Sequence, residues 1–319
     1  MKDINLNQPV GLALGSGSAR GLAHIGVLKY FEDNNIKVGW IAGSSMGALI
    51  GAAYALGISS NEMIQIAENL DWKLMVKLFS PSISGRGMIS DRYLIPFLQS
   101  LYGDAKIEDL KIPFGAVSTD LYAGERIVIS QGNLVEAVRA SISIPVILHP
   151  IRIGNHTLVD GGLVDPVPVE VVKQMGADQV IAVDVAISPK KAMKDSDDIQ
   201  YTLRDKISAK INQTIPSEGL YQRMARFLRM SDDAVNDNLN IKSTSETDKI
   251  PNLFKIFWQS VTIAEQELTR LHLKVCPPDV IIKPDTGSIQ LWEFARAMEA
   301  IEAGEKAAKS KLKKLTNEK

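Results

Sequence analysis

The pattern of apolar and polar positions predicts strands that alternate with helices. Apolar residues alternate through residues 9–15 (PVGLALG) and then recur at helical spacing at Leu22, Ile25 and Leu28. The same order of strand, glycine-containing turn and helix recurs over residues 37–56. Further strand patterns lie at residues 113–119, 125–130, 149–155, 156–160, 179–185 and 279–284, and helical patterns lie at residues 133–141, 167–176, 257–273 and 291–315. Interleaved elements of this kind predict an α/β fold, a three-layer α/β/α domain.

A change in composition predicts one insertion in a single domain. We expect residues 8–319 to form that domain, with a more polar helical insertion or flap at about residues 188–250. Within it, residues 219–230 (GLYQRMARFLRM) place apolar side chains on one helical face and three arginines on another. Such a helix either packs as an ordinary amphipathic element or lies on an anionic bilayer, which gives peripheral membrane contact.

Charge and cysteine content narrow the classes of function. Lys plus Arg number 36 and Asp plus Glu number 37, so no strong overall field favours nucleic acid, and we expect no nucleic-acid partner. The single cysteine, Cys276, cannot form an internal disulfide or supply a metal cage. The first residues lack the charge and apolar run of a signal peptide. We therefore expect a cytoplasmic protein without metal or organic cofactor; the oligomeric state is left open.

An uncharged run at residues 38–61 has two interpretations. Its length and the glycines at spacing four, Gly43, Gly47 and Gly51, fit a membrane helix with a small-residue face. However, serines and glycines dilute the hydrophobicity, and neither flank carries a basic cluster. A strand, a tight turn (GSSMG) and a helix fit better, and the turn matches G-x-S-x-G. This pattern predicts that Ser45 is exposed on a strained turn as a nucleophile, although small residues also cluster at such turns for packing.

A second glycine turn lies at residues 15–21 (GSGSARG). A dinucleotide fingerprint would need glycine at its sixth position, where Arg20 stands, and no persuasive acidic ribose partner follows about 20 residues later. The alternative is a cradle of backbone N–H groups that receives an oxyanion, with Arg20 fixing the loop.

Together the two turns resemble those of the patatin-like phospholipases, and more narrowly the bacterial members related to neuropathy target esterase. That family has a G-G-G-x-R/K-G oxyanion loop, a G-x-S-x-G serine and an aspartate in D-G-A/G. SGSARG, GSSMG and VDGGLVDP resemble these motifs, and RASISIP and residues 277–308 also resemble the family. Ser16 and Ser18 stand where the loop pattern has glycine, which leaves the choice of N–H donors open.

The resemblance implies a three-layer sandwich with a central, mostly parallel sheet, and a serine lipid acyl hydrolase. Phospholipids or lysophospholipids are the implied substrates, cleaved at a carboxylic ester by a Ser45–Asp160 dyad through an acyl-enzyme. The implied loop residues are Gly17, Ser18, Arg20 and Gly21, and the nucleophile turn is flanked by Gly43 and Gly47. An acyltransferase with the same dyad and a non-catalytic adaptor on this fold are the alternatives.

The base that would activate Ser45 has several candidates in the sequence. Only four histidines occur, and a Ser, Asp, His order along the chain could use only His272 after Asp160. An aspartate can accept the serine proton directly if it lies within hydrogen-bond reach, although its ordinary pKa near 4 makes it a weak base. Asp160 is favoured by its D-G-G context, while Asp120, Asp165 and Asp184 also follow strand patterns.

Overall fold

The structure is a computed structural model that describes residues 4–69, 91–186, 253–287, 289, 291 and 293–317. The strands are β1 (Val10–Leu14), β2 (Val38–Ser44), β3 (Phe114–Asp120), β4 (Arg126–Ile129), β5 (Ile151–Ile153), β6 (His156–Asp160), β7 (Val180–Val183) and β8 (Val280–Ile282). The α-helices are α1 (Ala23–Asp33), α2 (Met46–Leu56), α3 (Ser60–Glu68), α5 (Asp91–Tyr102), α6 (Leu134–Ser141), α7 (Val169–Gln174), α10 (Leu253–Val275) and α11 (Ala297–Asn317). Short 3-10 helices are η1 (Ser18–Leu22), η2 (Ile107–Asp109), η3 (Gly161–Leu163) and η5 (Phe294–Arg296).

The chain divides into two units, one formed by Met1–Ser188 with Ile263–Lys319 and the other by Pro189–Thr262. The first unit contains all of the described sheet and both glycine turns. The expected insertion at about residues 188–250, including the basic helix at 219–230, lies outside the described residues.

The sheet is mixed and mostly parallel. Its strand order is β5-β6-β3-β2-β1-β7-β8, and β4 pairs with β3 off this path. Strands β1, β2, β3, β7 and β8 pair in parallel, whereas β4 and β6 run antiparallel to β3, and β5 antiparallel to β6. Strands β1 and β7 are buried throughout and consist of apolar residues and glycine, as expected for the centre of a parallel sheet. Strand β3 is also buried throughout, although it ends in Ser118, Thr119 and Asp120.

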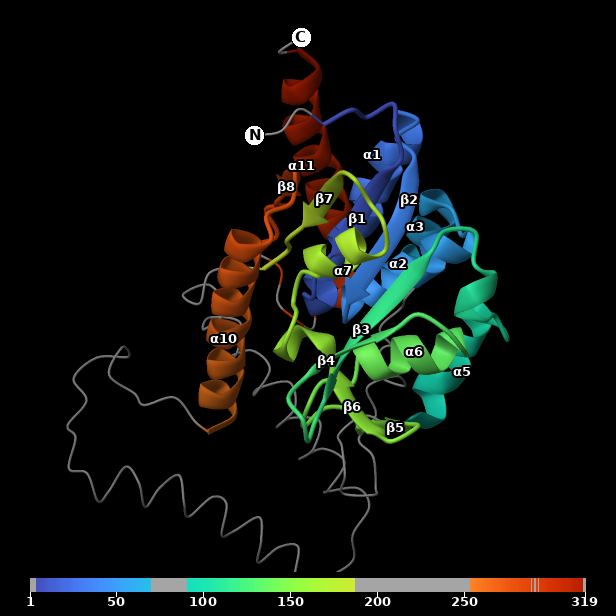
Figure 1. The fold of residues 1–319 in the computed structure, drawn as a ribbon, viewed down its shortest axis with the longest axis vertical. Coiled ribbons are helices and arrows are strands. Elements are labelled where there is room, and N and C mark those ends of the chain that lie inside the picture. The colour runs from blue at the N-terminus through green and yellow to red at the C-terminus, as the bar shows by residue number, and fades with distance from the viewer. Residues whose placement is uncertain are drawn as a thin grey trace, which may run out of the picture. The chain divides into compact units, whose positions relative to one another are not determined.

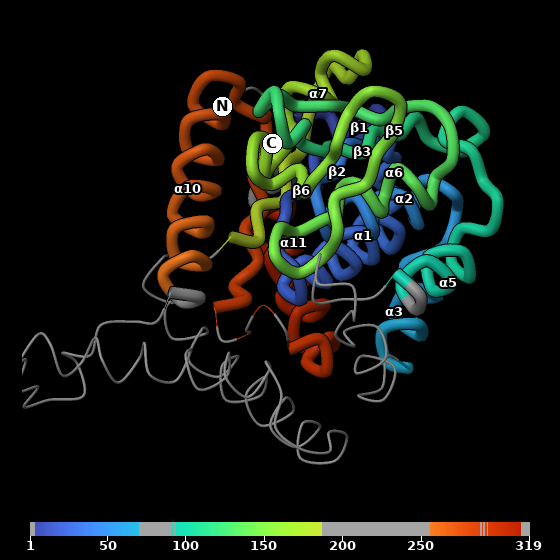
Figure 2. Tube along the Cα trace, turned by 90° about the horizontal axis from the view of Figure 1, so that it is seen from below, coloured from blue at the N-terminus to red at the C-terminus, as the bar shows by residue number. Residues whose placement is uncertain are grey.

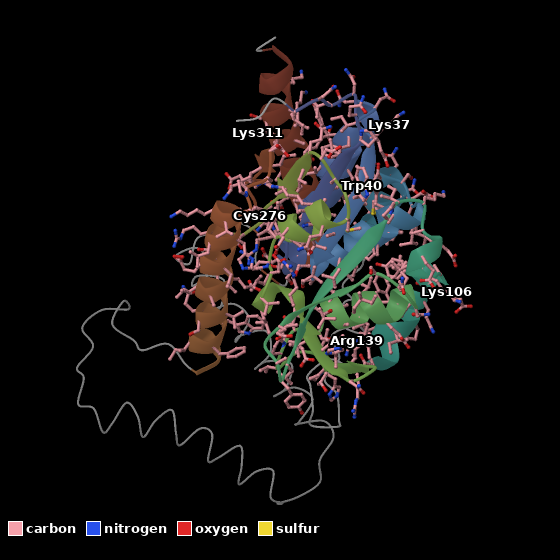
Figure 3. The ribbon with its side chains drawn as sticks, in the orientation of Figure 1. Lys37, Trp40, Lys106, Arg139, Cys276 and Lys311 are labelled. Atoms are coloured by element: carbon pink, nitrogen blue, oxygen red, sulfur yellow. The ribbon has the colours of Figure 1, made fainter. Side chains whose placement is uncertain are left out.

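Helices cover both faces of this sheet, as expected for three layers (Figure 1). Helices α1, α2 and α11 lie on one side of the strands and α7 on the other (Figure 2). The α7 face encloses an apolar core of Ala13, Ala42, Val117, Val167, Val169, Val171, Val172, Ala177, Val180 and Ala182, with Trp40 and Cys276 packed against it. Figure 3 labels the last two, Trp40 on β2 and Cys276 just after α10. Cys276 is thus a packing residue.

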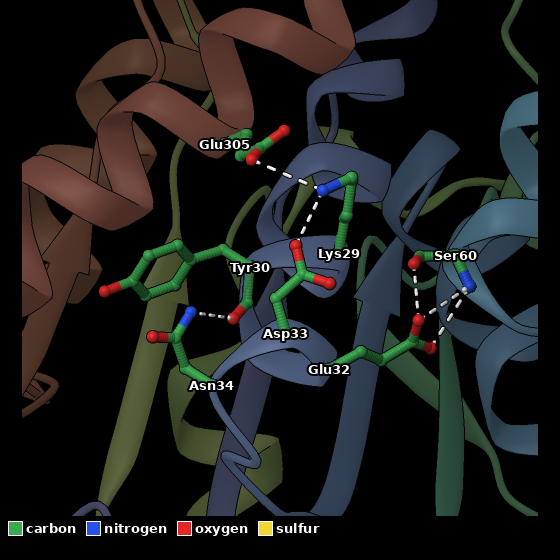
Figure 4. A network of polar contacts seen from close by, with 7 residues as sticks. All are labelled: Lys29, Tyr30, Glu32, Asp33, Asn34, Ser60 and Glu305. Atoms are coloured by element: carbon green, nitrogen blue, oxygen red, sulfur yellow. Dashed lines mark hydrogen bonds and ion pairs between the residues drawn. The ribbon is translucent and has the colours of Figure 1, made fainter.

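Helix α1 anchors the other layer. A β-carbon at Gly26 would collide with the backbone of Ile301, and one at Gly304 with the backbone of Ala23, so glycine at both positions lets α1 and α11 approach closely. Lys29 adds ion pairs to Asp33 at 2.6 Å and to Glu305 at 3.4 Å, and Glu32 accepts hydrogen bonds from Ser60 on α3 (Figure 4). These contacts hold both α11 and α3 against α1.

The two glycine turns meet at one edge of the sheet. In the register of β1 and β2, Leu14 pairs with Gly43. The next residues, Gly15 and Ser44, therefore lie side by side where the two strands end. Ligands of open α/β sheets bind outside the carboxyl ends of such strands. The topology therefore brings residues 15–21 and Ser45 together, although they come from separate strand–turn–helix units.

The predicted elements are confirmed, with shifts at their ends. Residues 38–61 contain β2, α2 and the start of α3 rather than a membrane helix, and among the described residues no helix is long and apolar enough to cross a membrane. Helix α7 is shorter than the pattern at 167–176, because Pro168 is its N-cap. The last helix begins at Ala297 after a 3-10 turn, not at residue 291.

Candidate active site

Ser45 occupies a strained turn between β2 and α2. Its backbone has φ 54° and ψ −120°, outside the regions that a non-glycine residue normally occupies. A β-carbon at Gly43 would collide with the Gly47 backbone, and one at Gly47 with the Leu14 carbonyl. The two glycines of G-x-S-x-G are therefore required by the close approach of β1, β2 and α2, which presents Ser45 at the helix start.

Asp160 lies within hydrogen-bond distance of this serine. Ser45 Oγ donates to Asp160 Oδ2 over 2.7 Å, and both residues are buried, with 5% and 4% of their surface exposed. Asp160 ends β6 and caps η3, where the Gly162 N–H donates to Oδ1 over 2.8 Å. Each oxygen of the carboxylate thus has one donor, which fixes the group facing Ser45.

Burial makes this carboxylate a better base than a free one. Desolvation raises the pKa of Asp160 from 3.8 to about 6, although the hydrogen bonds from Ser45 and Gly162 oppose the shift. A base whose pKa lies nearer the working pH accepts a proton more readily while still being ionised. At neutral pH the group remains mostly ionised and can receive the serine proton.

The glycine loop leaves two N–H groups unused. Gly15 N–H donates to Val183, Ser16 N–H to Pro166 and Ala19 N–H to Leu291, all through backbone carbonyls at 2.8–3.1 Å. Within the described part of the chain, the N–H groups of Gly17 and Ser18 make no such bond. Two neighbouring unused donors are the arrangement that stabilises an oxyanion.

The serine at position 18 adopts a conformation that normally belongs to glycine. Its φ is 49°, and its hydroxyl donates to the Leu291 carbonyl over 2.7 Å. The hydroxyl is thereby directed away from the loop N–H groups and holds the loop to the segment after β8. This contact supports the left-handed conformation of Ser18 at a position where the loop pattern has glycine.

Arg20 and Gly21 complete the loop as packing residues of η1. Arg20 is buried, with 3% of its surface exposed, and its charge acts on Glu265 of α10. A β-carbon at Gly21 would meet the side chain of Met46, the residue after Ser45. The final glycine of the loop therefore allows η1 to pack directly against the start of α2.

The other strand-end aspartates have different partners. Asp120 pairs with His156 at 2.6 Å, Asp165 with Arg126 at 2.7 Å, and Asp184 with Lys283 at 2.8 Å. His272 lies 3.3 Å from Asp165, so the one histidine that could follow the Ser, Asp, His order is engaged elsewhere. Among the described residues, Asp160 is the carboxylate hydrogen-bonded to Ser45, and no cluster of three or more metal-ligating side chains occurs.

The sequence model of the patatin-like phospholipase family matches residues 12–173, half of the chain. The matched segment contains the glycine loop, Ser45 and Asp160. The chain belongs to the patatin-like phospholipase family.

Relatives extend this similarity over most of the chain. A protein named as an uncharacterized member of the NTE family from Mycobacterium tuberculosis is 30% identical over 327 residues, which cover 92% of this chain and 89% of the relative. The neuropathy target esterase of Drosophila melanogaster is 34% identical over 181 residues, covering 55% of this chain and 13% of that much longer protein. The solved structure of VipD from Legionella pneumophila covers 91% of this chain and 74% of its own, at 13% identity and a TM-score of 0.39.

Two side chains that the sequence did not single out support the patatin-like site. His24 Nε2 lies 2.8 Å from the Gly15 carbonyl, and complete burial lowers the pKa of His24 to about 4, so the ring is neutral and donates to the loop. Ser141, at the end of α6, accepts a hydrogen bond from the Ser45 N–H over 3.0 Å. The only sequence signal for Ser141 was its place in RASISIP, a stretch that resembles the family.

Proposed function

We propose that this patatin-like protein is a serine acyl hydrolase that cleaves carboxylic esters of phospholipids or lysophospholipids. The observation that carries the proposal is the 2.7 Å hydrogen bond from Ser45 Oγ to Asp160 Oδ2. It joins a nucleophile on a strained turn to a buried carboxylate with a raised pKa. A neighbouring pair of unused backbone donors supports the same chemistry.

Acylation begins with attack of Ser45 Oγ on the ester carbonyl carbon while Asp160 takes the hydroxyl proton. The carbonyl oxygen becomes an oxyanion, which the N–H groups of Gly17 and Ser18 stabilise. The tetrahedral intermediate then breaks its bond to the alcohol oxygen. Asp160 returns the proton to this leaving alcohol, and the acyl group stays on Ser45.

Deacylation repeats these steps with water. Asp160, ionised again, takes a proton from a water molecule as its oxygen attacks the acyl-enzyme carbonyl. The same loop N–H groups stabilise the second oxyanion. Its collapse releases the fatty acid and returns the proton to Ser45 Oγ, so one ester and one water give one acid and one alcohol. No cofactor or metal ion takes part in these steps.

The substrate class rests on the family and on the names of the relatives. The family is named for phospholipase activity, and one relative is named an esterase. A lipid substrate would bring the protein to a membrane surface during turnover.

The test is hydrolysis of a p-nitrophenyl acyl ester and of phospholipid and lysophospholipid micelles, with released fatty acid measured by mass spectrometry. We expect Ser45→Ala to lose activity by at least a thousandfold on every substrate. Ser100→Ala, at an exposed serine on α5, is the matched control and should equal the native protein. Equal activity of Ser45→Ala and native protein would contradict the mechanism, and inactivity of all forms would favour the adaptor alternative.

A further inference from the structure

Helix α10 places a carboxyl group beside the Ser45–Asp160 pair. Thr269, Leu273 and Cys276 follow Glu265 at helical spacing, and Thr269 is buried while Leu273 and Cys276 pack against the apolar core. Glu265 therefore lies on the inward face of α10, one turn before the buried threonine. The residue as a whole is partly exposed, but its carboxyl group points inward.

The position of the carboxyl group is defined by Gly162. A β-carbon at Gly162 would lie 2.6 Å from Glu265 Oε1, 3.1 Å from Asp160 Oδ1 and 3.1 Å from Ser16 Oγ. The two carboxyl groups thus flank the same small space, with the glycine loop as its third side. Any side chain at position 162 would fill this space, which explains the second glycine of D-G-G.

Two carboxylates this close cannot both ionise without cost, because their charges repel in a buried site. The charged groups that face Glu265 among the described residues are Asp160 from the end of β6 and Arg20 from η1. Farther along the same face of α10, His272 is paired with Asp165, which also binds Arg126. Asp160 thus opposes ionisation of Glu265, and Arg20 only partly offsets this.

We propose that Glu265 is a positioning residue of the active site, a neutral carboxylic acid that leaves Asp160 as the charged member of the pair and whose ionisation sets the alkaline limit of the reaction. This inference rests on the proposed function. The ionised form would add a negative charge beside the glycine loop, where the oxyanion develops, and would oppose its formation.

The surroundings of the Glu265 carboxyl group determine the direction of its pKa shift and the pH range in which the reaction slows. Burial, and after it the charge of Asp160, raise the pKa of Glu265 to about 8, although Arg20 opposes the shift. Because Asp160 has a pKa of about 6, the pair carries one negative charge between about pH 6 and pH 8. The reaction should be fastest in this interval.

The experiment is the rate of fluorophosphonate labelling of Ser45 between pH 5 and pH 9.5, in native protein, Glu265→Gln and Glu267→Gln. Glutamine keeps the size of a neutral carboxylic acid and cannot ionise. Glu267 lies on the same helix, is exposed and pairs with Arg270, so its variant is the matched control.

We expect the native and Glu267→Gln rates to fall about tenfold from pH 7.5 to pH 9.5. Glu265→Gln should retain the rise near pH 6 and lose the fall. Superimposable profiles for native protein and Glu265→Gln, or a native rate that stays level to pH 9.5, would overturn the proposal.

A second readout does not depend on activity. An acid whose pKa is raised in the folded protein destabilises the fold as the pH rises from the unfolded to the folded pKa. The Tm of Glu265→Gln relative to native protein should therefore increase between pH 4.5 and pH 8.5, and that of Glu267→Gln should not. If no form is labelled but this Tm difference appears, the hydrolase mechanism fails and the neutral buried acid stands; an unchanged Tm difference would overturn the neutral acid itself.

Discussion

The hydroxyl of Ser141 ties the turn at Ser45 to strand β3. It accepts a hydrogen bond from the Ser45 N–H at 3.0 Å and donates one to the Val117 carbonyl at 2.5 Å. Ser141 is completely buried, so water cannot replace either bond. The strained backbone at Ser45 is thus supported by a helix that lies 96 residues farther along the chain.

Replacing Ser141 should slow the reaction. Ser141→Ala leaves the buried Ser45 N–H and Val117 carbonyl without this partner, which costs about 1–3 kcal/mol per unsatisfied group. We expect the rate of fluorophosphonate labelling at pH 7.5 to fall by about ten- to a hundredfold. Ser143 is equally buried but bonds to Arg139, so Ser143→Ala is the control for loss of a buried hydroxyl. Equal labelling rates for the two variants would contradict the role of Ser141.

His24 should act through the glycine loop. The neutral ring donates to the Gly15 carbonyl, two residues before the first unused N–H group. We expect His24→Ala to lower kcat on a p-nitrophenyl ester by at least tenfold, because the loop loses its support. Glutamine can place an amide N–H near the position of Nε2, so His24→Gln should recover part of this loss. Similar rates for both variants would contradict a hydrogen-bonding role.

Gly47 is predicted to tolerate no side chain. In Gly47→Ala the new β-carbon would meet the Leu14 carbonyl, so β1 and α2 must separate. We expect a lower Tm and at least a hundredfold loss of labelling. At Gly103, which has φ 57°, a β-carbon meets nothing within 4 Å. Gly103→Ala should therefore cost only about 1 kcal/mol of backbone strain and leave the labelling rate unchanged. Native labelling in Gly47→Ala would contradict the packing of the turn.

The pKa of Asp160 predicts opposite effects on activity and stability. The reaction needs the ionised form, so labelling should rise with pH through about pH 6 and stay high until Glu265 ionises near pH 8. The fold prefers the neutral form, because burial raises this pKa from 3.8 to about 6, and stability is lost as the pH rises through that interval. The cost is about 3 kcal/mol above pH 6.

Asp160→Asn removes this charge and should show the stability effect directly. We expect its Tm relative to native protein to increase between pH 4.5 and pH 7.5, while its labelling rate stays low at both. A relative Tm that does not change with pH would contradict a buried, charged Asp160.

Local patterns were sufficient to predict the parts of the site that lie on turns. Glycines at 15, 43 and 47 are required by close backbone contacts and Gly17 by the side chain of Val185, and their spacing marks the turns in the sequence. The order of strands and helices likewise predicted three layers. The pairing of Ser45 with Asp160 could be predicted only from the resemblance to a family. In the structure, two strand pairings, β2 with β3 and β3 with β6, bring these residues together, and no local pattern in the sequence predicts those pairings.

The residues that support the site could not be predicted, because their partners are distant along the chain and the sequence around each of them does not identify a partner. His24, Ser141 and Glu265 each lie on an amphipathic helix, where a polar residue on the buried face does not identify its partner. The same holds for Leu291, whose carbonyl accepts from Ser18, 273 residues away. Only the packing of helices on the sheet assigns these contacts.

The most direct test of the mechanism is the intact mass of the protein after treatment with a fluorophosphonate, for native protein, Ser45→Ala and Asp160→Asn. We predict a single adduct on the native chain, none on Ser45→Ala, and labelling of Asp160→Asn that is slower by at least a hundredfold. Absence of an adduct on the native chain, or an adduct that persists in Ser45→Ala, would contradict an activated Ser45.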